Sequence, residues 1–357
     1  MVLNDDMLDA AFRYRKAEVW KQIYSDDIFA VKLSNGEIGY CSVMGNNGEH
    51  FALGLYLGDE GLKTFVCSLG GEGLSRIELL EHSLMFDCIT CDFMNAKDIR
   101  PEVKSVIKDY AARKGVKIQR PHGWPDFTRH QPFFAPWCIT DAGEGQLMVE
   151  ALDAAIAFGS FVKSGQLSFP YPEGSTTPTL SDWKKGGVRV PLLVPDGNGG
   201  YSLSETVSPA VSDDLYKEFP FENDIIAGKV KSLPSADVTL LCRWSYMPVP
   251  FYSDDDDEAP VYQPILMVID SENHDMNPVM PDVDSISASQ LLCTFANGFT
   301  KTYGGRPVEI VVDTPLSYSF LHDFCERCGI RLTVRDERLD ELDQVSNLML
   351  STMHMFF

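Results

Sequence analysis

The stretch VEIVVDTPLSYSFLHDFCERCGIRLTV (308–334) predicts a strand, a helix and a second strand in direct succession. Residues 308–313 and 330–334 are rich in β-branched side chains, which favour strands. Between them, residues 317–328 repeat apolar side chains at helical spacing, and Gly329 follows where a helix often ends in a left-handed conformation. This succession is typical of an α/β domain.

Three more strands and another helix precede this stretch in the second half of the chain. The strands are predicted at VTLLCRW (238–244), PILMVID (264–270) and a short run near Pro278 to Met280, and the helix at 287–304. The second half therefore has the order βββαβαβ.

The first half gives the same order after a leading amphipathic helix within residues 5–24. In chain order, strands are expected at 28–33, 38–44 and 51–57, followed by helical stretches from Glu60 to Ser83. A strand at 86–93, a helix at 101–114 and a strand from Val116 complete this half. The short polar, glycine-containing segments between the first three strands are typical of hairpin turns, so these strands are expected to form an antiparallel meander.

Two segments from the two halves align without a gap. IKDYAARKGVKI (107–118) lies over LHDFCERCGIRL (321–332), which places Gly115 on Gly329. The alignment predicts a diverged tandem duplication, in which each half is a mixed α/β unit with the topology of the ribonuclease H-like fold.

The expected domains are an N-terminal unit over 1–163 and a C-terminal unit over 236–357. The segment 164–235 between them is predicted to be a connector that contains a β-hairpin, with strands at 188–194 and 201–207.

Net charge bounds the choice of partners. The chain has 30 Lys and Arg residues against 52 Asp and Glu, a net charge of −22, which repels nucleic acid and anionic lipid. No basic and apolar leader opens the sequence, and the most apolar window, 151–162, is short for a membrane span. We therefore expect a cytoplasmic protein that binds neither nucleic acid nor membrane.

The nine cysteines include two pairs at C-x-x-C spacing, Cys88 with Cys91 and Cys325 with Cys328. Such pairs can bind zinc or undergo redox chemistry. In a strand, however, residues three apart point to opposite faces, and in the alignment Cys325 and Cys328 fall on Ala111 and Lys114. We expect buried free thiols at all four positions, and neither a metal nor a cofactor.

The segment from Ile265 to Ile330 also resembles the catalytic cores of integrases and transposases, which have the ribonuclease H-like fold. The resemblance implies two divalent metals held by acids within strand one, at the end of strand four and on a later helix. Strand one carries no acid in either half, while Asp270 ends strand two and Asp313 ends strand four. These two carboxylates are the candidate metal ligands.

A second resemblance rests on GEIGYCSVMGNNGEHFALGLYLGDEGL (36–62) and on GRPVEIVV (305–312) with the Cys-Gly-Ile turn that follows. By these motifs the chain is similar to a bacterial family known through domains of unknown function. The resemblance covers most of the chain and implies its architecture, but brings no catalytic residues with it.

The sequence HGWPDFTRHQPFFAPW (122–137) is predicted to be a loop rich in aromatic and basic side chains. Loops of this composition often bind ligands, and a loop that packs on its own domain has the same composition. The candidate binding residues are His122, Trp124, Arg129, His130 and Trp137.

Three other segments have weaker functional readings. The glycines at 70, 71 and 73 suggest a phosphate loop or a plain turn, and the acidic run 254–258 suggests a solvated turn rather than a calcium loop. The apolar tail MHMFF (353–357) would either cover a second copy of the chain or fold back on its own core.

The function most consistent with these features is binding of an unidentified protein or small molecule, without catalysis. The alternative is a divalent-metal-dependent hydrolase of the ribonuclease H-like type, in which Asp270 and Asp313 share an ion. A third reading is self-assembly into a homo-oligomer through the tail.

Overall fold

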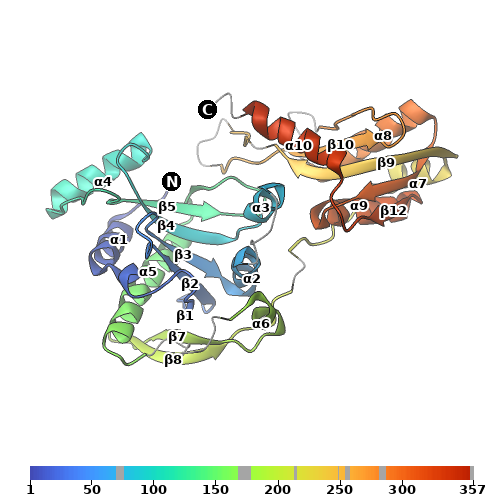
Figure 1. Cartoon of the computed structure of the whole chain (residues 1–357). Coiled ribbons are helices and arrows are strands. Elements are labelled where there is room, and N and C mark those ends of the chain that lie inside the picture. The colour runs from blue at the N-terminus through green and yellow to red at the C-terminus, as the bar shows by residue number, and fades with distance from the viewer. Residues whose placement is uncertain are drawn as a thin grey trace. The chain divides into compact units, whose positions relative to one another are not determined.

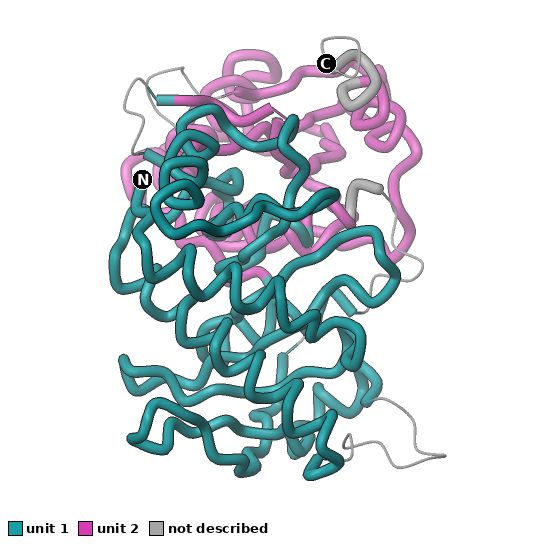
Figure 2. Tube along the Cα trace, turned by 90° about the vertical axis from the view of Figure 1, so that its left-hand side faces the viewer, with its two compact units in different colours: residues 1–75, 82–215, 253–259 teal, residues 76–81, 216–252, 260–357 magenta. Residues whose placement is uncertain are grey.

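The computed structural model of the chain describes residues 1–69, 76–167, 178–212, 215–247, 249–253, 258–280 and 287–353. They form two compact units, which Figure 2 distinguishes by colour. Unit 1 comprises 1–75, 82–215 and 253–259, and unit 2 comprises 76–81, 216–252 and 260–357. The division between the units at residue 215 falls within the segment predicted as a connector.

Unit 1 is built on an eight-stranded sheet with the order β6-β5-β4-β3-β2-β1-β7-β8. Its strands are β1 (Phe29–Lys32), β2 (Ile38–Met44), β3 (Ala52–Leu57), β4 (Cys88–Met94), β5 (Trp124–His130), β6 (Trp137–Cys138), β7 (Arg189–Pro195) and β8 (Tyr201–Val207). Strands β1 to β6 form an antiparallel series, as expected for the first three. The predicted hairpin is β7–β8, and β7 adds it to the sheet by pairing in parallel with β1.

The helices of unit 1 cover both faces of this sheet (Figure 1). They are α1 (Asp5–Ala17), α2 (Gly58–Leu69), α4 (Pro101–Lys114), α5 (Ala142–Lys163) and α6 (Leu180–Lys185), with a 3₁₀ turn at Val19–Lys21. The apolar residues of α1, α4 and α5 join one core cluster, whereas those of α2 and α6 join another. Alternate strand residues separate in the same way, since Leu55 belongs to the first cluster and Tyr56 to the second.

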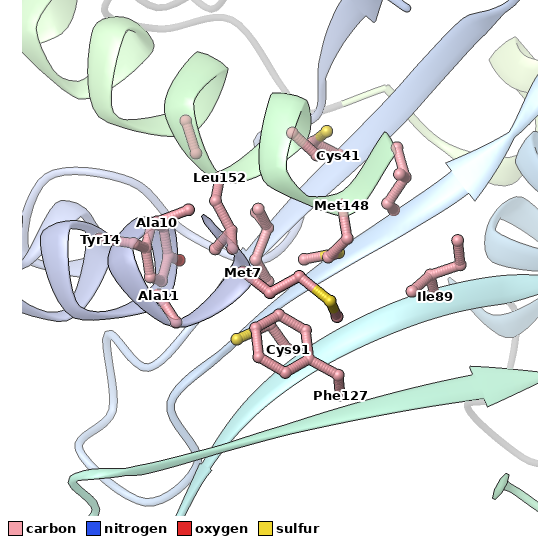
Figure 3. Packing of buried hydrophobic residues seen from close by; sticks show 14 of the residues in the cluster. Met7, Ala10, Ala11, Tyr14, Cys41, Ile89, Cys91, Phe127, Met148 and Leu152 are labelled. Carbon is pink, nitrogen blue, oxygen red and sulfur yellow. The ribbon is translucent and has the colours of Figure 1, made fainter. Parts of the chain in front are cut away.

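The larger core lies between the sheet and the pair α1 and α5 (Figure 3). Helix α1 begins at Asn4, whose side chain accepts a hydrogen bond from the N–H of Met7 at 3.0 Å, and so fixes the first turn. Met7 and Met148 come from the two helices and meet above Cys91 and Phe127 of the sheet (Figure 3).

Unit 2 has a four-stranded sheet with the order β10-β9-β11-β12. Its strands are β9 (Ser235–Tyr246), β10 (Pro264–Asp270), β11 (Arg306–Val312) and β12 (Arg331–Val334). Strand β9 pairs antiparallel with β10 and in parallel with β11, which also pairs in parallel with β12. The predicted third run is reduced to two antiparallel bridges on the outer side of β10, made by Met276 and Val279.

The helices of unit 2 are α7 (Asp224–Ser232), α8 (Ala288–Tyr303), α9 (Pro315–Cys328) and α10 (Asp340–Met353), and α3 (Arg76–Ser83) lies at the boundary of the two units. Helix α10 packs its Leu342 on the sheet residues Leu241, Met267 and Val311. Helix α9 packs on the other face, where the ring of Phe320 stacks on Trp244 at 4.1 Å. The strand, helix and strand predicted for 308–334 are confirmed.

The prediction that both halves share one topology is wrong. In unit 1 the strand before α4 pairs with β3 and β5, both antiparallel, whereas in unit 2 the strand before α9 pairs in parallel with β9 and β12. The strand predicted from Val116 is not present in this described segment: the next strand after α4 is β5, which begins at Trp124. The strand orders therefore give no support to a tandem duplication.

The alignment of the two segments has a local cause. Helices α4 and α9 are each 14 residues long, carry a proline in the first turn, and end at a glycine with φ of 67° and 69°. A proline start and a left-handed glycine stop impose the same residue pattern on two helices without common topology.

Three segments with predicted roles lie outside the described residues: the glycines at 70, 71 and 73, the acids at 254–257, and the tail at 354–357.

Among the described helices, only α5 is long and apolar enough to span a membrane. It has 22 residues and a mean hydropathy of 1.3. Its buried residues include Met148, Leu152, Ala155 and Phe158, all of them in the core of unit 1. A core helix passes the same test of length and composition.

Replacement of Phe158 by Ala is expected to lower the free energy of unfolding by about 3–5 kcal/mol, because it opens a cavity in the core. Phe158 is fully buried and its ring lies 4.4 Å from that of Phe29. Val106→Ala, at a position of α4 that is 36% exposed, serves as the control. Urea unfolding of both variants tests this, and equal losses would contradict the assignment of Phe158 to the core.

Candidate functional site

Asp313, the first candidate metal ligand, is buried against a guanidinium. Arg243 lies within β9 and neither side chain is exposed to solvent. Its Nε donates to Oδ1 of Asp313 at 3.0 Å, and its Nη2 donates to Oδ2. The carboxylate also accepts the N–H of Leu339 at 2.8 Å. Both oxygens of Asp313 are therefore engaged by the protein itself.

Helix α10 supplies further partners to the same guanidinium. Nη1 of Arg243 donates to Asp343 at 2.8 Å and to the hydroxyl of Ser346 at 3.1 Å. Asp343 in turn accepts a hydrogen bond from Nε of Arg338 at 3.1 Å. Burial alone would lower the pKa of Arg243, but the hydrogen bond and the charge of Asp313, with Asp343, raise it. Two cations and two carboxylates thus form one compensated cluster.

Asp270, the second candidate, lies elsewhere. Its side chain accepts the N–H groups of Glu272 and Asn273 at 2.9 and 3.3 Å and the hydroxyl of Tyr303 in α8 at 3.0 Å. Burial opposes its ionisation, yet these hydrogen bonds prevail and hold the pKa of Asp270 below its ordinary value. The residue closes a turn after β10.

The sheet keeps the two carboxylates apart. Asp270 pairs with Leu240 of β9, and its partner Tyr303 comes from α8, whereas Asp313 meets Arg243 and α10. Alternation along β9 places residues 240 and 243 on opposite faces. Asp270 and Asp313 are therefore not placed to share an ion. Nowhere in the described ranges do three His, Cys, Asp or Glu side chains gather closely enough to hold a metal.

The segment predicted as a binding loop in unit 1 is largely regular structure. Residues Trp124–His130 are strand β5 and Trp137–Cys138 are strand β6. The burial pattern of β5 does not alternate, since Trp124, Pro125 and Phe127 are buried and the residues after them are partly exposed, so the sequence offered no clear strand signal. The loop prediction is correct for the residues before β5 and for 131–136 between β5 and β6.

Three of the five candidate binding residues serve the structure of unit 1. Arg129 forms ion pairs with Asp87, just before β4, and with Glu144 of α5, at 2.7 and 2.8 Å. His130 pairs with Cys88 across the sheet, and burial lowers its pKa. Trp137 lies beneath the guanidinium of Arg100 at 5.3 Å.

The other two, His122 and Trp124, line a pocket. The pocket has a volume of ≈ 660 Å³ and is bounded by the turn after β4 and the segment before β5: Asn95, Ala96, Lys97, Gln119, Arg120, Pro121, His122 and Trp124. Nε of Arg15 donates to the carbonyl of His122 at 2.9 Å, and the N–H of His122 donates to Asn95 at 3.3 Å. The wall of the pocket is thus fixed by α1 and by the turn after β4.

A second pocket, of ≈ 320 Å³, adjoins the first and shares Gln119 with it. Its lining is Asp9, Phe12, Arg13, Arg15, Lys16, Tyr110, Val116, Lys117, Gln119 and Gly123. Sequence reasoning did not single out the basic residues of either pocket, because they come from α1, from the turn after β4 and from the segment between α4 and β5. No local motif contains them.

The four cysteines of the two C-x-x-C pairs are buried and free. As alternation predicts, Cys91 faces the core beneath α1 and α5 while Cys88 faces the opposite cluster. Burial raises the pKa of Cys88 and of Cys328 to about 12, and it also raises the pKa of Cys91 and of Cys325 well above the ordinary value. The thiolate, which is the reactive and metal-binding form, is therefore disfavoured at all four positions.

Comparison with known proteins identifies both parts of the chain. Residues 5–176 match the family model of a domain of unknown function, DUF7309, and residues 227–350 match that of another, DUF6930. The expected match to domains of unknown function is confirmed. No curated protein matches the chain.

Among solved structures, a chain in the intasome of simian T-cell lymphotropic virus, in complex with PP2A regulatory subunit B56 gamma, is similar in part. The similarity covers 35% of this chain and 43% of that chain, with 11% sequence identity and a TM-score of 0.23. Less than half of that chain is spanned, and a likeness at this level carries no argument.

Replacement of both Cys325 and Cys328 by Ala is expected to leave a folded protein that is destabilised by about 1–3 kcal/mol, since only small buried volumes are lost. Thermal unfolding and elemental analysis of the purified proteins test this. Stoichiometric zinc in the wild type that is absent from the double variant would show that the thiols bind metal.

Arg243→Met is expected to lower the free energy of unfolding by about 3–5 kcal/mol, because it leaves Asp313 as an uncompensated buried carboxylate. The double variant Arg243→Met/Asp313→Leu should regain most of this loss. Arg331→Met is the matched control: its ion pair with Glu309 spans 3.1 Å but its side chain is 65% exposed, so the cost is about 0–1 kcal/mol. Equal costs for Arg243→Met and Arg331→Met in urea unfolding would refute the inference.

Proposed function

We propose that this chain, which consists of two domains of unknown function, is a cytoplasmic binding protein without chemistry of its own. One observation carries the proposal: the carboxylate best placed to hold a metal, Asp313, is occupied on both oxygens by Arg243 and by a backbone N–H. An acid engaged in this way has no free oxygen for a divalent cation unless the cluster opens.

A finer assignment of unit 2 supports the same proposal. With the bridges at Met276 and Val279 counted as a residual third strand, the strand order is third, second, first, fourth, fifth, which we assign to the ribonuclease H-like fold. Enzymes with this fold place metal-binding acids in the first strand, after the fourth strand and on a later helix.

The corresponding positions of unit 2 hold one cation and two acids. They are Arg243 in β9, Asp313 after β11 and Asp343 in α10, and the guanidinium contacts both carboxylates. We infer that the positive charge of Arg243 stands where such enzymes hold their metal ions. A fixed internal cation satisfies the same acids without providing an open coordination position or activating water.

The alternative, a metal-dependent hydrolase, requires Asp313 to exchange Arg243 for a metal ion. Asp270 cannot assist, since it faces the other side of the sheet. The buried ion pair therefore favours the binding function over catalysis.

Within the proposed function, unit 1 supplies the binding site, at the two adjoining pockets beside His122 and Trp124. The partner is a protein or a small molecule. The net charge of −22 argues against nucleic acid and against anionic membranes. Self-association through the C-terminal tail remains a separate proposal.

Incubation of the protein with single- and double-stranded DNA and RNA in millimolar Mg²⁺ or Mn²⁺ is expected to give no cleavage above a buffer control. Asp313→Asn should behave as the wild type, because no step depends on its charge. Gel analysis of end-labelled substrates provides the measurement. Cleavage by the wild type that Asp313→Asn abolishes would establish the hydrolase instead.

A metal-binding assay with Arg243→Asp tests the role of the guanidinium directly. This change removes the internal cation and places a third carboxylate beside Asp313 and Asp343, so Mn²⁺ should raise the melting temperature of the variant but not that of the wild type. An equal stabilisation of both by Mn²⁺ would mean that the wild-type cluster already accepts a metal.

A further inference from the structure

The two adjoining pockets of unit 1 are basic, although the chain as a whole is strongly acidic. Four cations line the smaller pocket, Arg13, Arg15, Lys16 and Lys117, and two line the larger one, Lys97 and Arg120. The only carboxylate in either lining is Asp9. Six positive side chains around one shared wall are a marked local reversal of charge in a chain with a net charge of −22.

The negative charge of Asp9 is already compensated. Its side chain accepts the hydroxyl proton of Tyr110 in a hydrogen bond, and it pairs with Nζ of Lys114 at 3.1 Å. The first of these bonds is the largest cause of a lowered pKa of Asp9. Asp9 interacts with Lys114 and with Arg13, so Arg15, Lys16 and Lys117 have no further carboxylate in the lining of the pocket.

Some cations of this region have carboxylate partners. Arg113 pairs with Asp5, and Arg13, at the margin of the smaller pocket, pairs with Asp153, both at 2.7 Å. Lys16, Lys97, Lys117 and Arg120 are exposed and make no ion pair or side-chain hydrogen bond within the described part of the chain. With 52 acidic residues in the sequence, unpaired cations gathered at two pockets indicate a site that keeps its positive charge for a ligand.

The pockets also present apolar and ring surfaces. The half-buried ring of Phe12 stacks at 5.7 Å on the buried ring of Tyr110 in the smaller pocket, and the buried Trp124 backs the larger one. The amide side chains of Gln119 and Asn95 add hydrogen-bonding groups. A ligand that fits these surfaces has an apolar or planar body together with more than one anionic group.

The shared wall is held in place before any ligand binds. The guanidinium of Arg15 lies over the rings of Trp20 and Phe51, at 4.9 and 5.0 Å, and donates to the carbonyl of His122. This fixes the segment that carries Gln119 and Arg120 relative to α1. A pre-formed wall lowers the entropy cost of binding.

We propose that the two pockets form one site for a small organic polyanion, a molecule with a planar or apolar body and several phosphate or carboxylate groups. This inference rests on the proposed binding function and specifies the ligand class for it. The exposed side chains of Lys16, Lys117, Lys97 and Arg120 contact the anionic groups, while Phe12, whose ring stacks on the buried ring of Tyr110, contacts the body.

Calorimetric titration in metal-free buffer tests the site with three probes: ATP, inorganic triphosphate and citrate. ATP is expected to bind most tightly because it combines a ring with phosphates. Comparison of triphosphate with citrate shows whether the site binds phosphate groups or carboxylate groups. Binding should weaken as salt is raised, since exposed charges are screened.

Charge-reversal variants locate the binding. Lys16→Glu/Lys117→Glu and Lys97→Glu/Arg120→Glu should each weaken the binding of the tightest probe by about tenfold or more, because each removes two charged contacts. Lys108→Glu, an exposed change on α4 that lines neither pocket, is the control and should alter affinity by less than about threefold. Circular dichroism should show all three variants folded.

The outcomes distinguish this inference from the proposed function. Absence of saturable binding by all three probes, or binding that both double variants leave unchanged, would overturn the polyanion site but not the non-catalytic role. Hydrolysis of ATP on addition of Mg²⁺, lost in Asp313→Asn, would overturn the non-catalytic role while binding in metal-free buffer still supports the site.

Discussion

A guanidinium without access to solvent joins four segments of unit 2. Arg243 of β9 contacts Asp313 at the end of β11 and Asp343 and Ser346 of α10, and Asp313 in turn holds the backbone at Leu339. A buried charge is tolerable only when it is paired and hydrogen-bonded, so each segment has to lie where it does. The position of α10 on the sheet depends on this cluster as much as on its few apolar contacts. The same bonds remove Asp313 from metal chemistry, so the constraint on the fold is also the constraint on function.

Local patterns in the sequence were sufficient for most elements but not for their pairing. The strand, helix and strand around 317–328 were predictable because β-branched runs, helical periodicity and Gly329 all agree. The same signals at 101–114 predicted the helix correctly but its neighbouring strands wrongly. Proline and glycine determine where a helix begins and ends but not which strands lie beside it. Whether the next strand runs parallel or antiparallel depends on contacts between distant segments. The extra residues between Gly115 and Trp124 were the available sign that unit 1 differs.

The candidate sites show the same limit. Asp313 could be selected because it ends a strand, but its partners are Arg243, 70 residues before it, and the N–H of Leu339, and no spacing rule connects them. In unit 1, His122 and Trp124 could be selected because their segment is rich in aromatic and basic residues. The lysines and arginines beside them could not, because the chain as a whole has a net charge of −22. Net charge describes the average surface, and a binding site is a departure from that average.

The parallel pairing of β1 with β7 has a consequence for biosynthesis. Strand β1 ends at Lys32, yet the neighbour that covers its outer edge begins at Arg189. While the ribosome makes the intervening residues, the meander β1–β2–β3 exposes an unpaired strand edge, a template for pairing with other chains. Only when the β7–β8 hairpin emerges can this edge be closed. The long interval between the two strands makes the nascent chain of unit 1 most vulnerable to aggregation during translation.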